Sequence, residues 1–219
     1  MFRGQIKKLE CLCMKIAELV LVLIILPLLV VLAPFKLPHI PLLVCGGVFA
    51  TVRVWRHVSF KRLFARPPRL WWRGPCIRAA VVAVAACFYV LLNSPELFLS
   101  FPKNRTEMWS LVMLLYPVLS VLPQEIIYRV YIFEKFFPEP HQEKLAIIAS
   151  SVLFSWVHVI YAGYFAMLST LMAGCVLGVS YSRSRRQPGA LWAVLLEHSV
   201  YGMLIFTVGL GRFFFLSRG

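Results

Sequence analysis

The fold of this chain is set by apolar stretches such as residues 108–137, MWSLVMLLYPVLSVLPQEIIYRVYIFEKFF. A helix that spans a bilayer needs about 20 mostly apolar residues, so this stretch is long enough to cross. Proline inside a helix removes one hydrogen bond and kinks or breaks it. We therefore expect a break in this stretch close to Pro123.

Shorter apolar runs precede and follow that stretch, at about 16–35, 40–55, 79–92, 145–161, 164–182 and 190–208. The chain is 60% hydrophobic, well above the roughly 45–50% of an average soluble domain. Its mean hydropathy of +0.79 agrees. These runs predict an all-α polytopic transmembrane helix bundle with about seven spanning helices, six to eight in all.

The charged residues predict how the bundle is oriented. All nine acidic residues are glutamates, and 23 Lys and Arg residues give a net charge of +14. The bases cluster between apolar runs at 3–15, 53–78 and 183–186, where the positive-inside rule places cytoplasmic segments. We expect a multi-pass protein of a bacterial inner membrane with a cytoplasmic N-terminus. The basic stretches then bind the anionic bilayer surface, not nucleic acid.

Ionisable side chains collect in the last four apolar runs, namely Glu125, Arg129, His158, Glu197 and His198. Each charge at mid-bilayer costs about 2.5–3.5 kcal/mol on insertion scales. Taken singly, a Glu125–Arg129 salt bridge or a lone histidine has a purely structural explanation. Together they indicate a site, because polar groups in lipid must face one another or a cavity. A carboxylate beside two imidazoles is equipped to activate water and hydrolyse an amide bond, with the histidines stabilising an oxyanion or holding a metal.

Three short motifs follow one another on separate apolar runs. They are Gln124-Glu125-x-x-x-Arg129, Phe154-x-x-x-His158 and His198. In this order they resemble the type II CAAX prenyl endopeptidase and bacteriocin-processing family (CPBP, ABI), which comprises multi-helix intramembrane proteases.

The resemblance implies an organisation of the chain and a role for each site residue. Residues 1–105 would be N-terminal transmembrane helices with the basic cytoplasmic loop, 106–209 the CAAX-protease-like catalytic core, and 210–219 a short tail. Gln124 and Glu125 would activate the water and Arg129 would orient it. His158 and His198 would polarise the scissile carbonyl or bind a divalent metal such as Zn. The substrates would be membrane-anchored peptides or proteins, prenylated or otherwise processed.

Two positions depart from the family pattern. Gln124 stands where the family has the first of two glutamates, and an amide cannot act as a base. Gly202 stands four residues after His198, where the family has Asn or Asp. Glu125 and Glu197 are possible substitutes, but each side chain points about 100° away from its neighbour on a helix. A break at Pro123 would further free backbone N–H groups at Gln124 and Glu125 as oxyanion donors.

The departures leave alternatives to the leading hypothesis of an intramembrane endopeptidase. An inactive relative that binds membrane peptides as an adaptor would tolerate Gln124 and Gly202. A proton-coupled transporter would use Glu125, Arg129 and the histidines as an ion path. Transporters often show discontinuous helices in matching positions of two halves. Here the intramembrane ionisable residues collect in one half, which argues against a transporter.

Overall fold

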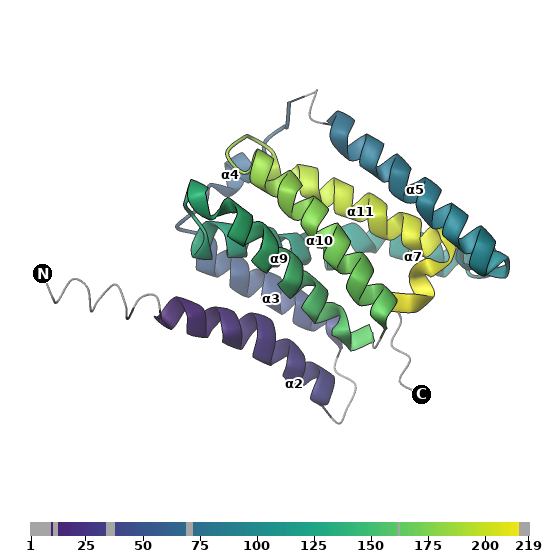
Figure 1. The fold of residues 1–219 in the computed structure, drawn as a ribbon, viewed down its shortest axis with the longest axis horizontal. Helices are drawn as coiled ribbons and strands as arrows, with labels where there is room; N and C mark the ends of the chain where they lie inside the picture. Colours follow the sequence, from purple (N-terminus) through teal and green to yellow (C-terminus); the bar gives the residue numbers. More distant parts are fainter. Residues whose placement is uncertain (1–9, 11–12, 34–37, 69–71, 162, 215–219) are drawn as a thin grey trace, which may run out of the picture.

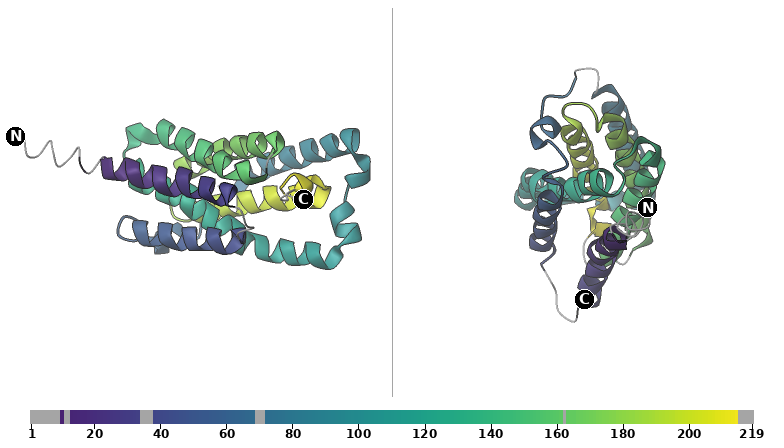
Figure 2. Two further views of the ribbon diagram at one scale, coloured as in Figure 1. Left: turned by 90° about the horizontal axis from the view of Figure 1, so that it is seen from below. Right: turned by 90° about the vertical axis from the view of Figure 1, so that its left-hand side faces the viewer.

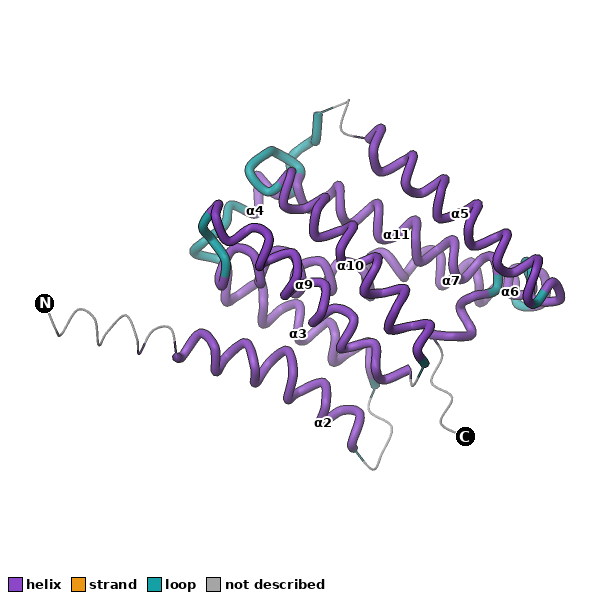
Figure 3. Tube along the Cα trace, viewed as in Figure 1, coloured by secondary structure: helices purple, strands orange, loops and turns teal. Residues whose placement is uncertain are grey.

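The chain forms a bundle of helices. The computed structural model describes residues 10, 13–33, 38–68, 72–161 and 163–214, and within these every regular element is a helix and none is a strand (Figures 1 and 3). Six helices in this part of the chain are long and apolar enough to cross a membrane, and His39–Val54 is a shorter apolar helix. The predicted all-α polytopic bundle is confirmed.

The six candidate spans are Cys13–Val30, Arg73–Asn93, Thr106–Phe136, Pro140–Tyr161, Tyr164–Ser184 and Ala190–Val208. The individual elements along the described chain are η1 (Leu21–Ile25), α2 (Leu26–Leu32), α3 (His39–Val54), α4 (Phe60–Leu63), α5 (Arg73–Asn93), η3 (Pro95–Leu97), α6 (Ser100–Asn104), α7 (Thr106–Tyr116), η4 (Pro117–Val121), α8 (Leu122–Glu125), η5 (Ile126–Phe136), η6 (Pro140–Gln142), α9 (Glu143–Val157), η7 (His158–Tyr161), α10 (Tyr164–Ser184), α11 (Ala190–Val208) and η8 (Leu210–Phe214).

The segment η5 forms the centre of the bundle. Its residues Val130, Tyr131, Ile132 and Phe133 are fully buried, and it packs between α3 and α9. The helices α9, α10 and α11 lie side by side, with α5 at one edge of the bundle against α11 and α2 at the opposite edge (Figures 1 and 2). The outer helices keep large apolar side chains exposed, as expected where lipid is the solvent.

The predicted break near Pro123 is wrong. The helix runs without interruption from Thr106 to Phe136. A π-helical turn at Pro117–Val121, in which the N–H of Leu122 bonds to the carbonyl of Pro117, stands just before Pro123. Such wide turns accommodate a missing hydrogen bond by bending the helix locally. The expectation that Gln124 and Glu125 carry free backbone N–H donors depended on the break and loses its basis.

The connections rich in Arg and Lys meet at one end of the bundle. The N–H of Gly189 donates to the Arg62 carbonyl at 2.9 Å, and Arg185 Nη2 donates to the Pro138 carbonyl at 3.0 Å. The basic stretches 53–78 and 183–186 therefore lie together, apart from residues 69–71, which are outside the described part. Most of the basic start at 3–15 is outside it too. This clustering agrees with the positive-inside rule, and the cytoplasmic placement of this end stays a prediction.

Close packing of α9 on α10 fixes the helix that carries His158. A Cβ atom at Gly174 would lie 3.0 Å from the Cα of Ser151, and one at Gly178 would lie 3.3 Å from the side chain of Ile147. Small residues four apart let two membrane helices approach closely where dispersion, not the hydrophobic effect, holds them together. The position of His158 therefore depends on this contact.

We predict that Gly174→Leu destabilises the protein by about 1–3 kcal/mol, because overpacking pushes α9 away from α10. The measurement is the thermal unfolding midpoint of purified protein in detergent. Gly163→Ala is the control, since a Cβ there meets only the Tyr161 carbonyl at 3.7 Å. Equal midpoints for the two variants would contradict the importance of this contact.

Candidate active site

Three parts of the fold bring polar side chains together inside the bundle. Gln124, Glu125 and Arg129 come from the central helix through α8 and η5, His158 begins η7 at the end of α9, and His198 lies on α11. All five side chains are buried. The helix Thr106–Phe136, which carries Glu125, is the central helix. Glu125 has no exposed surface, so it lies inside the bundle.

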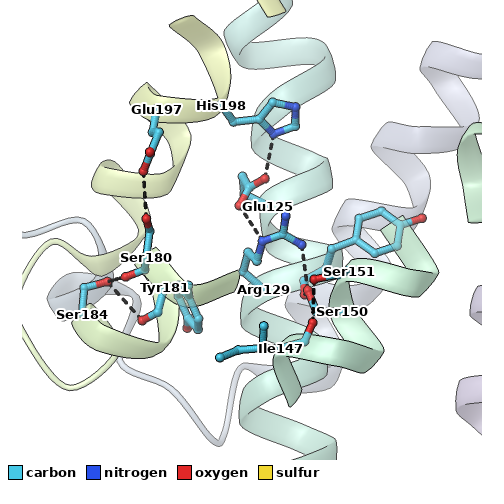
Figure 4. A network of polar contacts seen from close by, with 11 residues as sticks. Glu125, Arg129, Ile147, Ser150, Ser151, Ser180, Tyr181, Ser184, Glu197 and His198 are labelled. Atoms are coloured by element: carbon cyan, nitrogen blue, oxygen red, sulfur yellow. Dashed lines mark hydrogen bonds and ion pairs between the residues drawn. The ribbon is translucent and has the colours of Figure 1, made fainter. Parts of the chain in front are cut away.

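Glu125 is bound on both sides and has no exposed surface. Its Oε1 lies 2.7 Å from Nδ1 of His198, and its Oε2 lies 3.4 Å from Nε of Arg129 (Figure 4). The contact with Arg129 is an ion pair without hydrogen-bond geometry, because Oε2 and Nε both lack a hydrogen-bond partner among the described residues. The carboxylate is thus held between a guanidinium and an imidazole.

Arg129 is anchored from the other side by α9. Its Nη1 donates to Ser150 Oγ at 2.7 Å, and that hydroxyl donates in turn to the Tyr128 carbonyl at 2.7 Å. The guanidinium also lies 5.0 Å from the centre of the Phe154 ring, a favourable cation–π arrangement. A buried cation therefore has a carboxylate, a hydroxyl and an aromatic face around it.

Both histidines are oriented through Nδ1. His158 Nδ1 lies 2.6 Å from the Phe154 carbonyl oxygen, which can only accept, so this nitrogen carries the proton. His198 Nδ1 donates to the Glu125 carboxylate by the same reasoning. In a singly protonated imidazole with this orientation, the lone pair is on Nε2. The two rings flank Phe154, at centroid distances of 4.8 Å for His158 and 5.4 Å for His198.

A cavity of about 370 Å³ adjoins these residues. Gln124, His158 and His198 line it, whereas Glu125 does not. Successive helical residues point about 100° apart, so the glutamine faces the cavity and the glutamate faces the interior behind His198. Gln124 Nε2 donates to Ser120 Oγ at 2.8 Å, and its Oε1 has no partner among the described residues.

The order and geometry of these motifs agree with a comparison against known families. Residues 106–204 match the type II CAAX prenyl endopeptidase Rce1-like family. This part of the chain is Rce1-like. No curated protein and no solved structure matches the chain. The resemblance inferred from the motifs is confirmed, and because the Rce1-like family is a family of proteases, the match supports a peptidase at this coarse level.

The structure places Glu197 outside the cavity lining. Its carboxylate accepts hydrogen bonds from Arg78 at 2.6 and 3.0 Å, from Ser180 at 2.9 Å and from Tyr201 at 2.6 Å, and in Figure 4 it points away from His198. These bonds tie α5 and α10 to α11. The expectation that Glu197 substitutes for the Asn or Asp of the Rce1-like pattern is wrong, because a residue adjacent to His198 faces the other side of the helix.

The sequence reasoning missed two residues of this region. Ser150 accepts a hydrogen bond from Arg129. It stands four residues before Phe154, and this spacing in the sequence places the two residues on the same helical face. Tyr116 lines the cavity with Ser120 and Gln124, and the spacing of four between these residues also marks one face. In an apolar run, a serine or tyrosine did not stand out beside charged residues.

The donor set does not complete a metal site of the usual kind. His158 and His198 each leave Nε2 available beside the cavity. The described residues contain no group of three or more His, Cys, Asp and Glu side chains placed to hold a metal, whereas catalytic zinc has three protein ligands. Two imidazoles fall one ligand short of such a site. The prediction of a divalent metal such as Zn remains to be tested.

We predict that Ser150→Ala lowers the free energy of unfolding by about 1–3 kcal/mol, because Nη1 of the buried Arg129 loses its partner. Thermal unfolding in detergent measures the change. Ser199→Ala is the matched control, since Ser199 is also buried but donates only to the Leu195 carbonyl of its own helix. A Ser150→Ala midpoint equal to that of Ser199→Ala would show that the Arg129 contact contributes nothing.

Proposed function

We propose that this chain is an intramembrane endopeptidase that hydrolyses a peptide bond of membrane-anchored substrates, with His198 activating the water. The observation that carries the proposal is the dyad of His198 and Glu125. The imidazole lines the cavity while its Nδ1 is held at 2.7 Å by a fully buried carboxylate. Glu125 itself has no place on the cavity wall, so it acts through His198 and not on the water directly.

The reaction uses the lone pair on His198 Nε2. This nitrogen accepts a proton from water as the oxygen attacks the scissile carbonyl carbon, and the resulting imidazolium is stabilised by Glu125 at Nδ1. The tetrahedral intermediate collapses as Nε2 returns the proton to the leaving amine. Arg129, 3.4 Å from the carboxylate, supplies the positive charge that pairs with Glu125 inside the bundle. The histidine thus shuttles one proton from water to amine.

Two further cavity residues assist this step. His158 donates from Nδ1 to the Phe154 carbonyl oxygen, so its Nε2 accepts a hydrogen bond from the second hydrogen of the attacking water and fixes the direction of that water. Gln124 uses one N–H on Ser120 and keeps another to donate to the oxyanion. The glutamine therefore contributes a hydrogen bond in this scheme and not a base.

The cavity wall fits a substrate that arrives from the bilayer. Leu111, Leu115 and Leu119 line the cavity and are also exposed on the outer surface. These leucines lie on α7 and η4. A single layer of side chains therefore separates the cavity from lipid at this wall. A peptide anchored in the membrane, whether prenylated or not, reaches such a site without crossing a polar surface.

One observation favours a second function. No carboxylate lines the cavity within the described residues, because Gln124 replaces the first glutamate of the pattern and Gly202 the Asn or Asp. If His198 does not accept the proton from water, no carboxylate on this wall can replace it, and the same cavity would hold a membrane peptide without cleaving it. The second candidate is therefore a peptide-binding adaptor.

Proteolysis in native membranes tests the proposal, with membrane-anchored peptides read out by mass spectrometry. We expect His198→Ala and Glu125→Gln to lower cleavage by about 10²–10⁴-fold, the usual contribution of a general base, and His158→Ala to accumulate the same uncleaved peptide. His57→Ala, which alters an exposed histidine outside the cavity, is the control. If no peptide differs between wild type and these variants while Gln124→Glu creates cleavage, the adaptor function replaces the protease.

Metal analysis of the purified protein tests the divalent-metal prediction. If His158 and His198 hold Zn, wild type contains about one equivalent and either alanine variant loses it, because both imidazoles are needed. Metal content that is the same in wild type and both variants would rule out this pair as ligands.

A further inference from the structure

Gly202 leaves a space beside His198 that another helix fills. Four residues apart on α11, the two residues share one face, and both line the cavity. A Cβ atom at Gly202 would lie 2.1 Å from the hydroxyl oxygen of Tyr116 and 2.4 Å from its Cζ. No side chain larger than hydrogen fits there while Tyr116 keeps its position.

Tyr116 is held in that place by its ring. It is the last residue of α7, directly before the π-helical turn that starts at Pro117. The ring meets His198 edge-on at a centroid distance of 6.4 Å and Phe206 at 5.4 Å. Tyr116 also lines the cavity, and its hydroxyl lies against Gly202, one helical turn from the proposed base.

We propose that Tyr116 is a further catalytic residue, whose hydroxyl donates a hydrogen bond to the carbonyl oxygen of the bound peptide and to the oxyanion formed from it. This inference rests on the proposed hydrolysis at His198. The phenolic proton stays on oxygen, and the water proton still travels through His198. A tyrosine hydroxyl is an effective oxyanion donor in a site that excludes water. Because Gly202 has no side chain, the Tyr116 hydroxyl of α7 can occupy this position and serve as the hydrogen-bond donor.

The alternative is that Tyr116 only fills space, and Tyr116→Phe separates the two roles. Phenylalanine keeps the ring against Gly202, His198 and Phe206 and removes only the hydroxyl. We expect kcat for peptide cleavage to fall by about 10²–10³-fold, the effect of removing one oxyanion donor, while KM changes by less than about 3-fold. Tyr89→Phe, on α5 and outside the cavity, is the matched control. A wild-type kcat in Tyr116→Phe would overturn the proposal.

A second set of variants moves the donor from one helix to the other. Tyr116→Ala vacates the space, and adding Gly202→Asn places an amide N–H beside His198. We expect this double variant to recover at least 10-fold of the activity lost in Tyr116→Ala, because an amide can also donate to the oxyanion. Tyr116→Ala with Gly202→Leu fills similar volume without a donor and recovers none. Equal recovery in both double variants would assign Tyr116 a packing role only and overturn the proposal.

His198→Ala in the same assay distinguishes failure of this inference from failure of the proposed function. If His198→Ala abolishes cleavage and Tyr116→Phe leaves kcat unchanged, the Tyr116 donor is disproved and the protease stands. If wild type and His198→Ala cleave no peptide, both proposals fall together. Loss of kcat in Tyr116→Phe and in His198→Ala, with correct folding by thermal unfolding, supports both.

Discussion

The burial of the Glu125 carboxylate is the constraint on which the rest of the site depends. An ionised carboxylate without surface exposure costs several kcal/mol unless charged and hydrogen-bonding partners surround it. Arg129 and His198 supply those partners. Arg129 in turn needs Ser150 and the ring of Phe154. A single carboxylate thereby fixes the relative positions of the central helix, α9 and α11, and in doing so sets the direction of the His198 ring.

The same rule places the helices at the edges of the bundle. Glu197 binds Arg78 at 2.6 Å and so holds α5 on α11. Glu18, in the first candidate span, pairs with Arg53 at 2.6 Å and also with Lys135. Apolar surface gives no preference between a helix neighbour and a lipid chain, so these ion pairs specify contacts that packing alone leaves undetermined. Each removes charge from the bilayer by pairing it within the protein.

The cavity combines this charged scaffold with a wall that carries no carboxylate among the described residues. Glu125 lies one layer behind His198, and Gln124 takes the position that faces the cavity. The substitutions at Gln124 and Gly202 are linked to their surroundings. The glutamine bonds to Ser120, and the glycine admits Tyr116. Both departures from the motif pattern therefore have partners of their own within the fold.

The sequence by itself determined the membrane spans, the Rce1-like motifs and the gathering of ionisable residues, because hydropathy and motif order are local properties of the chain. The sequence did not determine that the helix stays intact at Pro123. The π-helical turn at Pro117–Val121, just before this proline, depends on how the whole segment packs. Nor could the sequence decide which of Gln124 and Glu125 faces the cavity, because the rotation of the central helix is set by Arg129, Ser150 and His198 on three elements. Only the tertiary structure brought Tyr116 to Gly202. The Tyr116 ring occupies the space that a side chain at position 202 would otherwise fill.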